Sequence, residues 1–378
     1  MYVESRPVSK AAVRSRPRRM PAPPAGRWPH RHLLQLYGLP AADLRTVLRR
    51  TRTYAEGLPA SLIDPHDVGR GGKDFSSELR GMVAANLFFE DSTRTRVSFS
   101  VAAARLGVRV IDLTNMGSSV SKGETVGDTV LNIAAMGADA MVIRHRSSGS
   151  THLVVRTLQE RHDAAARKGG SPVHIPSIVN AGDGRHEHPT QGLLDIYTLA
   201  AAFDRLDTFD LKGLTVVILG DIGSSRVARS GVAGMTALGA RVICVGPPSL
   251  VPAAFTTLGC EVSHDLDAVI HQADAINVLR IQFERHEIKQ PGAGENAPKA
   301  TSSNAIASIR EYHELYGISP RRAGHMKRGA IIMHPGPINR GVELTPEVAD
   351  SGRSMVLRQV SHGVAVRMAV LSLCLGAR

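Results

Sequence analysis

Two kinds of apolar pattern alternate along most of the chain. Short, nearly continuous apolar runs are typical of buried strands, and between them apolar residues recur every three or four positions, as on one helix face. Strands connected by helices in this way form parallel sheets. The expected strands are 82–89, 108–113, 139–145, 175–180, 214–220, 240–246, 259–263, 274–280 and 329–335. The expected helices are 39–56, 98–107, 128–137, 153–168, 188–203, 224–239 and 266–273, followed by one or two packed helices within 355–375.

The alternation falls into two series. At 378 residues the chain is long enough for two domains of ordinary size. The segment DRLDTFDLKG, residues 204–213, has the character of a turn between domains, and LTVVILG opens the second series. We therefore predict an α/β protein of two doubly wound parallel-sheet domains, residues 31–200 and 201–354. Residues 290–305 are poor in bulky apolar side chains and are predicted to form an inserted flexible loop.

Positive charge is concentrated at the start of the chain. The formal net charge is +12, and residues 1–32 hold eight Arg or Lys against the single acid Glu4. Several prolines prevent a regular helix there, so residues 1–30 are predicted to be a disordered basic tail. The prolines also disrupt the amphipathic helix of a transit peptide. Nothing downstream has the pattern of a base-reading module, so no nucleic-acid partner is expected.

Hydropathy and cysteine usage narrow the class of protein further. No apolar segment approaches the roughly 20 residues that cross a bilayer, so no membrane association is expected. The three cysteines, Cys244, Cys260 and Cys374, are widely spaced and form no CxxC pair. They fit a reducing, cytoplasmic compartment, and they disfavour both a disulfide framework and a structural zinc site.

Polar clusters follow six of the expected strands at their carboxyl ends. Open α/β sheets bind ligands at this edge. The clusters are EDSTRTR after 82–89, RHR after 139–143, NAGDGRHEHPTQ after 175–179, GDIGSSR after 214–219, RIQFER after 274–279 and HPGP after 329–333. Their repeated occurrence at the same edge predicts a shared ligand site.

The cluster EDSTRTR has the chemistry of a phosphate site. A strand-to-helix turn leaves backbone N–H groups unsatisfied beside a partial positive charge. Ser92, Thr93 and Thr95 add hydroxyl donors, and Arg94 adds a two-pronged guanidinium suited to phosphate. Arg94 and Arg96 are two residues apart and point in different directions, so we expect one to meet the anion and the other to form an ion pair. The alternative is an ordinary helix cap with surface arginines.

The other clusters of the first series are weaker signals on their own. Ser118 and Lys122 lie in a polar segment that could be a solvated loop with a cation near its tip. Arg144, at a strand end, could equally form a structural salt bridge. His188 and Gln191 are three residues apart on one predicted helix face, and their place beside the other clusters favours a functional role.

The second series offers cations suited to carboxylates. Arg226 stands at a predicted helix start, and Arg280 and Gln282 point the same way from an extended segment. GDIGSSR departs from G-x-G-x-x-G, the glycine spacing of dinucleotide-binding sites, and the next strand does not end in an acidic residue that could bind a ribose. Both observations disfavour the binding of a dinucleotide cofactor. In HPGP, prolines stiffen a loop whose carbonyls could accept hydrogen bonds from an amine.

The combined inventory points to two anionic substrates. A phosphate-bearing molecule and a dicarboxylate that meet between two domains would fit these clusters. The sequence shows no metal-ligand cluster, nucleophile elbow or Walker loop, so neither a metal nor another cofactor is expected.

Taken in order, these motifs resemble one family. The resemblance is to the catalytic chains of the aspartate carbamoyltransferase family, and it rests on FFEDSTRTRVSF, SSVSKGET, VIRHR, NAGDGRHEHPTQGLLD, GDIGSSRVARS, LRIQFER and HPGPINRGVE. LRQVSHGVAVRMAVL resembles the family's closing helix. The resemblance implies condensation of carbamoyl phosphate with L-aspartate to N-carbamoyl-L-aspartate and phosphate, the committed step of pyrimidine synthesis. It implies that residues 31–200 bind carbamoyl phosphate, that 201–354 bind aspartate, and that a helix within 355–378 packs back on the first domain.

The resemblance also implies a role for each matching residue. Thr95, Arg144 and His188 would contact the carbamoyl oxygen as the catalytic residues. Carbamoyl phosphate would be held by these three together with Ser92, Thr93, Arg94, Gln191, Gly336 and Pro337. Among them, Gln191 would contact the carbamoyl NH₂ group. Aspartate would be bound by Lys122, Arg226, Arg280 and Gln282. Glu90 would bridge the domains by pairing with Arg226 and Arg285, and the loop from Ser118 to Lys122 would come from a neighbouring subunit.

A shared loop would make a homotrimer the minimal active unit, with regulatory chains or dihydroorotase as further candidate partners.

Two alternative functions stay open at this point. Ornithine carbamoyltransferase shares the phosphate half, but ornithine should not need Lys122, Arg280 and Gln282 around a second carboxylate, and that sibling tends to have a cysteine where Gly336 stands. A non-catalytic scaffold homologue would be expected to lose parts of STRTR or the KGET lysine, and both are intact.

Overall fold

The computed structural model describes residues 28–59, 72–114, 125–170, 173–281 and 308–376, and the backbone of two short strands, Glu287–Ile288 (β9) and Ala300–Thr301 (β10). These two strands pair antiparallel, so part of the segment predicted to be a flexible loop has β structure. The remainder of that predicted loop and residues 1–27 of the predicted tail lie outside the described residues.

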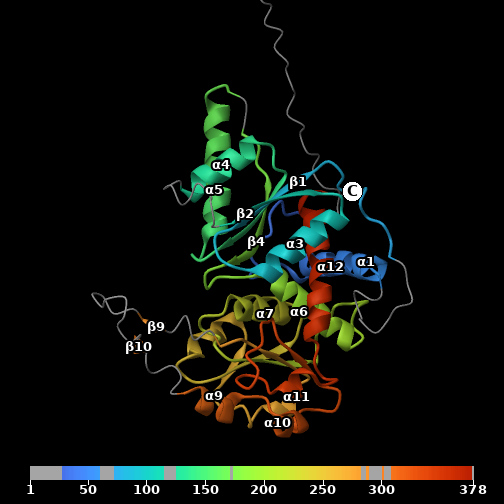
Figure 1. Ribbon diagram of the computed structural model, residues 1–378, viewed down its shortest axis with the longest axis vertical. Coiled ribbons are helices and arrows are strands. Elements are labelled where there is room, and N and C mark those ends of the chain that lie inside the picture. Colours follow the sequence, from blue (N-terminus) through green and yellow to red (C-terminus); the bar gives the residue numbers. More distant parts are fainter. Residues whose placement is uncertain are drawn as a thin grey trace, which may run out of the picture.

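Two parallel sheets form the frame of the molecule (Figure 1), with strand orders β2-β1-β3-β4 and β11-β8-β5-β6-β7. The first sheet consists of β1 Val83–Phe88, β2 Arg109–Thr114, β3 Ala140–His145 and β4 Ser177–Asp183. The second consists of β5 Thr215–Leu219, β6 Arg241–Val245, β7 Glu261–Ser263, β8 Ala275–Val278 and β11 Ile331–Met333. The predicted class, two α/β domains built on parallel sheets, is confirmed.

Helices cover both sheets. Those of the first domain are α1 Ala41–Gly57, α3 Thr93–Arg105, α4 Val126–Ala135, α5 Ser150–Arg167 and α6 Pro189–Ala202. The second domain has α7 Arg226–Ala237, α9 Ile309–Tyr316, α10 Pro320–His325 and α11 Pro346–Ala349. A single helix, α12 Val356–Cys374, ends the described chain and packs on α1, α3 and α6, so the C-terminal helix returns to the first domain as predicted. Among the described residues, no helix has the length and apolar character needed to span a membrane.

Side chains from both faces of the first sheet are buried. Ala85 and Leu87 of β1 lie in a small core with residues of α4 and α5, whereas Ala84 and Phe88 lie in the large core with residues of α1, α3 and α12. Because strand side chains alternate between faces, burial on both sides produces the continuous apolar run seen in the sequence.

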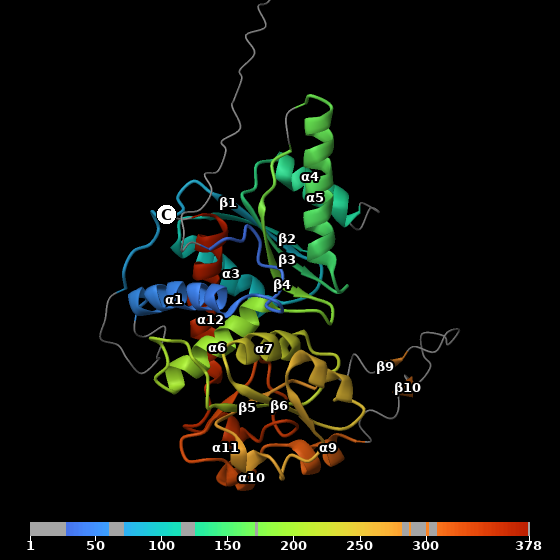
Figure 2. The same cartoon turned by 180° about the vertical axis from the view of Figure 1, so that it is seen from behind.

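The large core continues across the domain boundary. Helices α6 and α7 pack together between the two sheets (Figures 1 and 2). Gly192 of α6 permits this close approach, because a Cβ there would lie 2.9 Å from the Ser230 Cβ of α7. This packing sets how the carboxyl edges of the two sheets face each other.

Three expectations from the sequence need correction. The described chain begins inside the predicted tail, and Trp28 is already buried, so the folded body starts earlier than residue 31. The predicted helix 266–273 contains only the 3-10 turn Ile270–Gln272, because the segment must enter β8 at Ala275 and one turn suffices to bury its apolar residues. Helix α3 begins at Thr93 rather than 98, since its polar first turn has no apolar periodicity to reveal it.

Candidate active site

A cavity of about 170 Å³ opens between the two domains at the carboxyl ends of their strands. Of the residues predicted to form the site, those lining it are Ser92, Arg94, Thr95, Arg144, His188, Gln191, Arg226, Arg280 and Gly336. Arg367 also lines it, so five arginines surround the cavity against one acid, Asp221, among the described lining residues. The cavity is therefore strongly cationic.

Two of the predicted residues lie beside the cavity without lining it. Thr93 and Pro337 are exposed and do not line the cavity, although each neighbours a residue that does. Ser118, Lys122, Gln282 and Arg285 lie outside the described residues. Their predicted roles stay predictions.

The first turn of α3 forms one wall. Ser92 is the N-cap residue, and Thr95 is buried against the cavity. The Arg94 guanidinium reaches the second domain, where a Cβ on Gly336 would lie only 3.2 Å from its Cζ atom, and the φ of +67° at Gly336 also favours glycine. Partial burial and the charge of Arg280 lower the pKa of Arg94. The cation predicted for phosphate and one predicted for carboxylate thus share the cavity.

Glu90 joins the two domains at a second wall. Its carboxylate accepts hydrogen bonds from Arg226 Nη1 at 3.0 Å and Nη2 at 3.2 Å, and it lies 3.5 Å from Arg144 Nη2. Glu90 follows β1 and Arg144 is the penultimate residue of β3, whereas Arg226 is the first residue of α7 in the other domain. Arg226 occupies a helix start because Ser225 caps α7, accepting a bond from Ala228 N. The bridge holds both arginines at the cavity.

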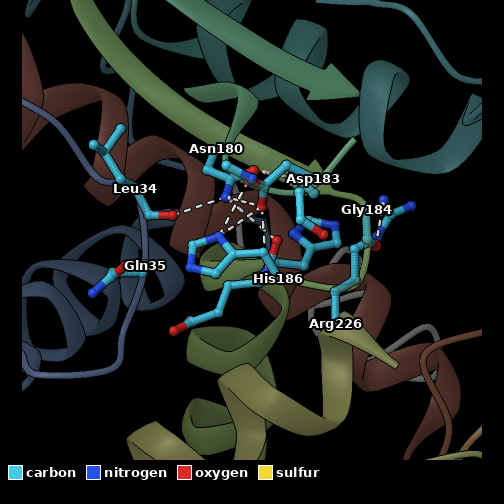
Figure 3. Close-up of polar contacts among 12 residues, drawn as sticks. Leu34, Gln35, Asn180, Asp183, Gly184, His186 and Arg226 are labelled. Atoms are coloured by element: carbon cyan, nitrogen blue, oxygen red, sulfur yellow. Dashed lines mark hydrogen bonds and ion pairs between the residues drawn. The ribbon is translucent and has the colours of Figure 1, made fainter. Parts of the chain in front are cut away.

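A rigid turn after β4 supports this wall (Figure 3). The buried Asp183 carboxylate accepts hydrogen bonds from Asn180 Nδ2 at 2.7 Å and from the backbone N–H of Gly149 at 2.8 Å, and His186 Nδ1 lies 3.0 Å from it. Asn180 also donates to the Leu34 carbonyl, which ties the turn to the N-terminal segment. The hydrogen bond with Asp183 raises the pKa of His186. The motif NAGDGRHE therefore builds a scaffold around the site.

The position of His188 depends on contacts from both domains. Its backbone N–H donates to Ser230 Oγ of α7 at 2.9 Å, and Ser230 Oγ donates to Glu187 Oε2 at 2.8 Å. Glu187 is buried and also accepts from the backbone N–H groups of Leu36 and Tyr37. Burial, with the charges of the nearby arginines, lowers the pKa of His188 well below its usual value. The imidazole is therefore neutral near pH 7 and can donate a hydrogen bond without carrying charge.

The floor of the cavity contains a polar cluster that the sequence argument missed. Gln191 Nε2 donates to Asp195 Oδ1 at 2.9 Å, and Gln359 of α12 donates to the same oxygen at 2.8 Å. Asp195 could have been noticed, because it lies four residues beyond Gln191 and so shares its helix face. Gln359 and Arg367 had no sequence signal, because only the packing of α12 brings them here. Burial lowers the pKa of Arg367 to about 10, and its guanidinium lies over the Phe99 ring.

The HPGP segment forms the last wall. His334 Nε2 lies 3.2 Å from Glu343 Oε1, both side chains being fully buried, and His334 Nδ1 accepts the backbone N–H of Gly336 at 2.8 Å. These bonds hold the segment against the cavity. Nothing in the described chain groups three or more His, Cys, Asp or Glu side chains as a metal site.

Two parallel α/β domains around such a cavity define a class of protein, one that holds small anionic molecules together between its domains. Comparison with known families is more specific. The aspartate/ornithine carbamoyltransferase model for the carbamoyl-P binding domain matches residues 31–201, and the model for the Asp/Orn binding domain matches 212–374. The chain belongs to the aspartate/ornithine carbamoyltransferase family, which confirms the resemblance seen in its motifs.

Individual members of the family resemble this chain over nearly its whole length. The aspartate carbamoyltransferase catalytic subunit of Myxococcus xanthus (strain DK1622) is 47% identical over 345 residues, covering 91% of this chain and 99% of that protein. Aspartate transcarbamoylase from Trypanosoma cruzi, solved in complex with carbamoyl phosphate and aspartate, gives a TM-score of 0.70 at 27% identity, covering 93% of this chain and 98% of that one. Ornithine carbamoyltransferase from Pyrococcus furiosus gives a TM-score of 0.70 at 25% identity, covering 94% and 98%.

Proposed function

We propose that this protein transfers the carbamoyl group of carbamoyl phosphate to L-aspartate, forming N-carbamoyl-L-aspartate and phosphate as the committed step of pyrimidine synthesis. The observation that carries the proposal is the shared cavity, in which Arg94 and Thr95 of the α3 turn face Arg226 and Arg280 of the second domain. Two anions repel each other in water, and the arginines offset that repulsion while the cavity orients the reactants. Relatives named aspartate carbamoyltransferase over most of the chain support the choice.

The residues suggest a direct transfer. The aspartate amine attacks the carbonyl carbon, a C–N bond forms, and the C–O bond to phosphate breaks. Negative charge develops on the carbonyl oxygen, where Thr95, Arg144 and the neutral His188 would donate hydrogen bonds. Removing one such donor typically costs about 10²–10³ in rate. The departing phosphate takes the amine's proton, which makes a separate general base unnecessary.

The charge of the second domain's wall favours aspartate over ornithine. The fold alone does not distinguish the two acceptors, because aspartate transcarbamoylase and ornithine carbamoyltransferase structures match this chain with the same TM-score of 0.70. Arg226 and Arg280 suit the two carboxylates of aspartate, whereas the second ammonium group of ornithine would be repelled by them.

We further propose a homotrimer in which Ser118 and Lys122 complete a neighbour's site. The segment that carries them follows β2 in the chain, and the end of β2, the edge strand of the first sheet, lies at the periphery of that sheet. A cytoplasmic location is proposed from the three cysteines, which form no disulfide. Association with regulatory chains or dihydroorotase stays a prediction.

A colorimetric assay for carbamoyl-aspartate, run with aspartate and ornithine in parallel, tests the reaction. Carbamoyl transfer to aspartate alone is expected, and Arg94→Ala should abolish carbamoyl phosphate binding. Transfer to ornithine instead, or near-normal carbamoyl phosphate affinity in Arg94→Ala, would refute the assignment.

The trimer has a separate test. Mixing Lys122→Ala with Arg94→Ala subunits should restore activity, because some of the re-formed sites contain neither substitution. No recovery after verified subunit exchange would contradict the shared site.

A further inference from the structure

Asp195 is a buried carboxylate directly behind the cavity. It is fully buried on α6 and accepts hydrogen bonds from three side-chain amides. Gln191 Nε2 and Gln359 Nε2 lie 2.9 and 2.8 Å from Oδ1, and Asn277 Nδ2 lies 3.0 Å from Oδ2. The three amides belong to α6, α12 and β8, so a single carboxylate connects both domains and the closing helix.

This arrangement decides which end of the Gln191 amide faces the cavity. A side-chain amide has an oxygen that accepts and a nitrogen that donates, and the two ends have nearly the same shape. An ionised carboxylate only accepts, so it binds the Gln191 NH₂ group and repels the oxygen. Gln191 lines the cavity, and its Oε1 is therefore the end left to meet a substrate donor.

Gln359 extends the same constraint to the opposite wall. Its Nε2 donates to Asp195, and its Oε1 accepts the backbone N–H of His334 at 2.8 Å. His334 in turn accepts the N–H of Gly336, beside the carbonyls of the HPGP segment. A continuous chain of hydrogen bonds thus runs from Gln191 through Asp195 to the loop that lines the other side of the cavity.

We propose, resting on the function proposed above, that Asp195 is a positioning residue that turns Gln191 Oε1 toward the carbamoyl NH₂ and so makes the site selective for carbamoyl phosphate over acetyl phosphate. In acetyl phosphate a methyl group replaces the NH₂ group and cannot donate a hydrogen bond. A buried acceptor that faces a methyl group loses its water without gaining a partner. With Asp195 absent, the Gln191 amide can rotate and this discrimination disappears.

The decisive measurement is the ratio of kcat/KM for carbamoyl phosphate to kcat/KM for acetyl phosphate, with aspartate as acceptor and phosphate release as readout. Asp195→Leu removes the acceptor at similar volume and should lower this ratio about 10- to 100-fold. Thr198→Val is the matched control. It breaks another buried contact between α6 and α12, the 2.9 Å bond of Thr198 Oγ1 with His362 Nδ1, and should leave the ratio unchanged.

The ratio separates positioning from folding, because a smaller folded fraction lowers both kcat/KM values equally. An Asp195→Leu enzyme that loses activity toward both phosphates to the same extent would overturn the proposal. If the wild type transfers no carbamoyl group to aspartate, the proposed function fails and this inference fails with it. An active wild type whose ratio survives Asp195→Leu overturns this inference alone.

A second pair of variants applies if Asp195→Leu does not fold. In Asp195→Asn the new amide still has an oxygen that can accept from Gln191. Without the contact from Gln359, that amide can also rotate and present its NH₂ group to Gln191 instead. Asp195→Asn combined with Gln359→Met should therefore lower the ratio about 10-fold relative to Gln359→Met alone. Equal ratios in these two variants would refute the positioning role.

Discussion

Replacing Gly182 with alanine tests whether the placement of Arg226 limits the reaction. Gly182 is a buried residue near the end of β4 and has a φ of +111°. A Cβ at this position would lie 2.8 Å from Arg226 Nε, 3.1 Å from Arg226 Cζ and 3.2 Å from Arg144 Nη1. The methyl group would thus press on two of the cations that line the cavity.

The size of the effect follows from these distances. Ordinary contacts begin at 3.4 Å, so the Arg226 guanidinium would have to move by about 0.6 Å. That shift would loosen its bonds to Glu90, now 3.0 and 3.2 Å long. Misplacing a reacting group by about 1 Å can cost about 10²-fold in rate. We therefore expect kcat/KM for aspartate to fall about 10-fold or more in Gly182→Ala.

The assay varies aspartate at saturating carbamoyl phosphate and measures carbamoyl-aspartate. Gly81→Ala is the control, because Gly81 also has a positive φ, +89°, but a Cβ there meets nothing within 4 Å. Both variants carry a backbone strain of about 1–3 kcal/mol, which thermal unfolding would register. Only Gly182→Ala displaces the arginine. Equal kcat/KM values for aspartate in the two variants, corrected for folded fraction, would refute the reasoning.

Three further outcomes are expected. Glu90→Gln removes the anion between Arg144 and Arg226 and should lower the free energy of unfolding, measured by urea titration, by about 3 kcal/mol. An unchanged free energy of unfolding would contradict a stabilising role for the bridge. Burial raises the pKa of Asp195 from 3.8 to about 6. Ionisation of this carboxyl group therefore lowers the free energy of unfolding by up to about 3 kcal/mol. This loss is absent below pH 3.8, grows as the pH rises, and is complete above pH 6. Asp195→Asn should therefore stabilise the protein more at pH 8 than at pH 4, and an equal gain at both would contradict this pKa. His188→Ala should lower kcat about 10²–10³-fold and His188→Gln, which still donates, distinctly less; equal losses would contradict a role as neutral donor.

Much of the fold followed from local patterns. Continuous apolar runs such as VVIL identify strands buried on both faces, and clusters such as STRTR and HPTQ mark their carboxyl ends. Because parallel strands share a direction, those clusters had to gather at the sheet edges, and nine of the predicted residues do line one cavity. The polar first turn of α3 escaped prediction because it has no helical apolar periodicity, whereas the apolar spacing of 266–273 predicted a full helix where only the turn at 270–272 forms.

The sequence by itself determined the two sheets, most of the helices and the chemistry available at each strand end, since these depend on periodicity and residue type over a few positions. Helices α9, α10 and α11 of the second domain were not predicted. Only the tertiary structure decided that Asp195 collects amides from three elements and that Arg367 of the last helix enters the site, and the bridge from Glu90 to Arg226 was expected only from the family resemblance. These contacts join residues far apart in the chain. Their existence depends on how α6, α7 and α12 pack, and a buried charge is acceptable there only because that packing supplies its partners.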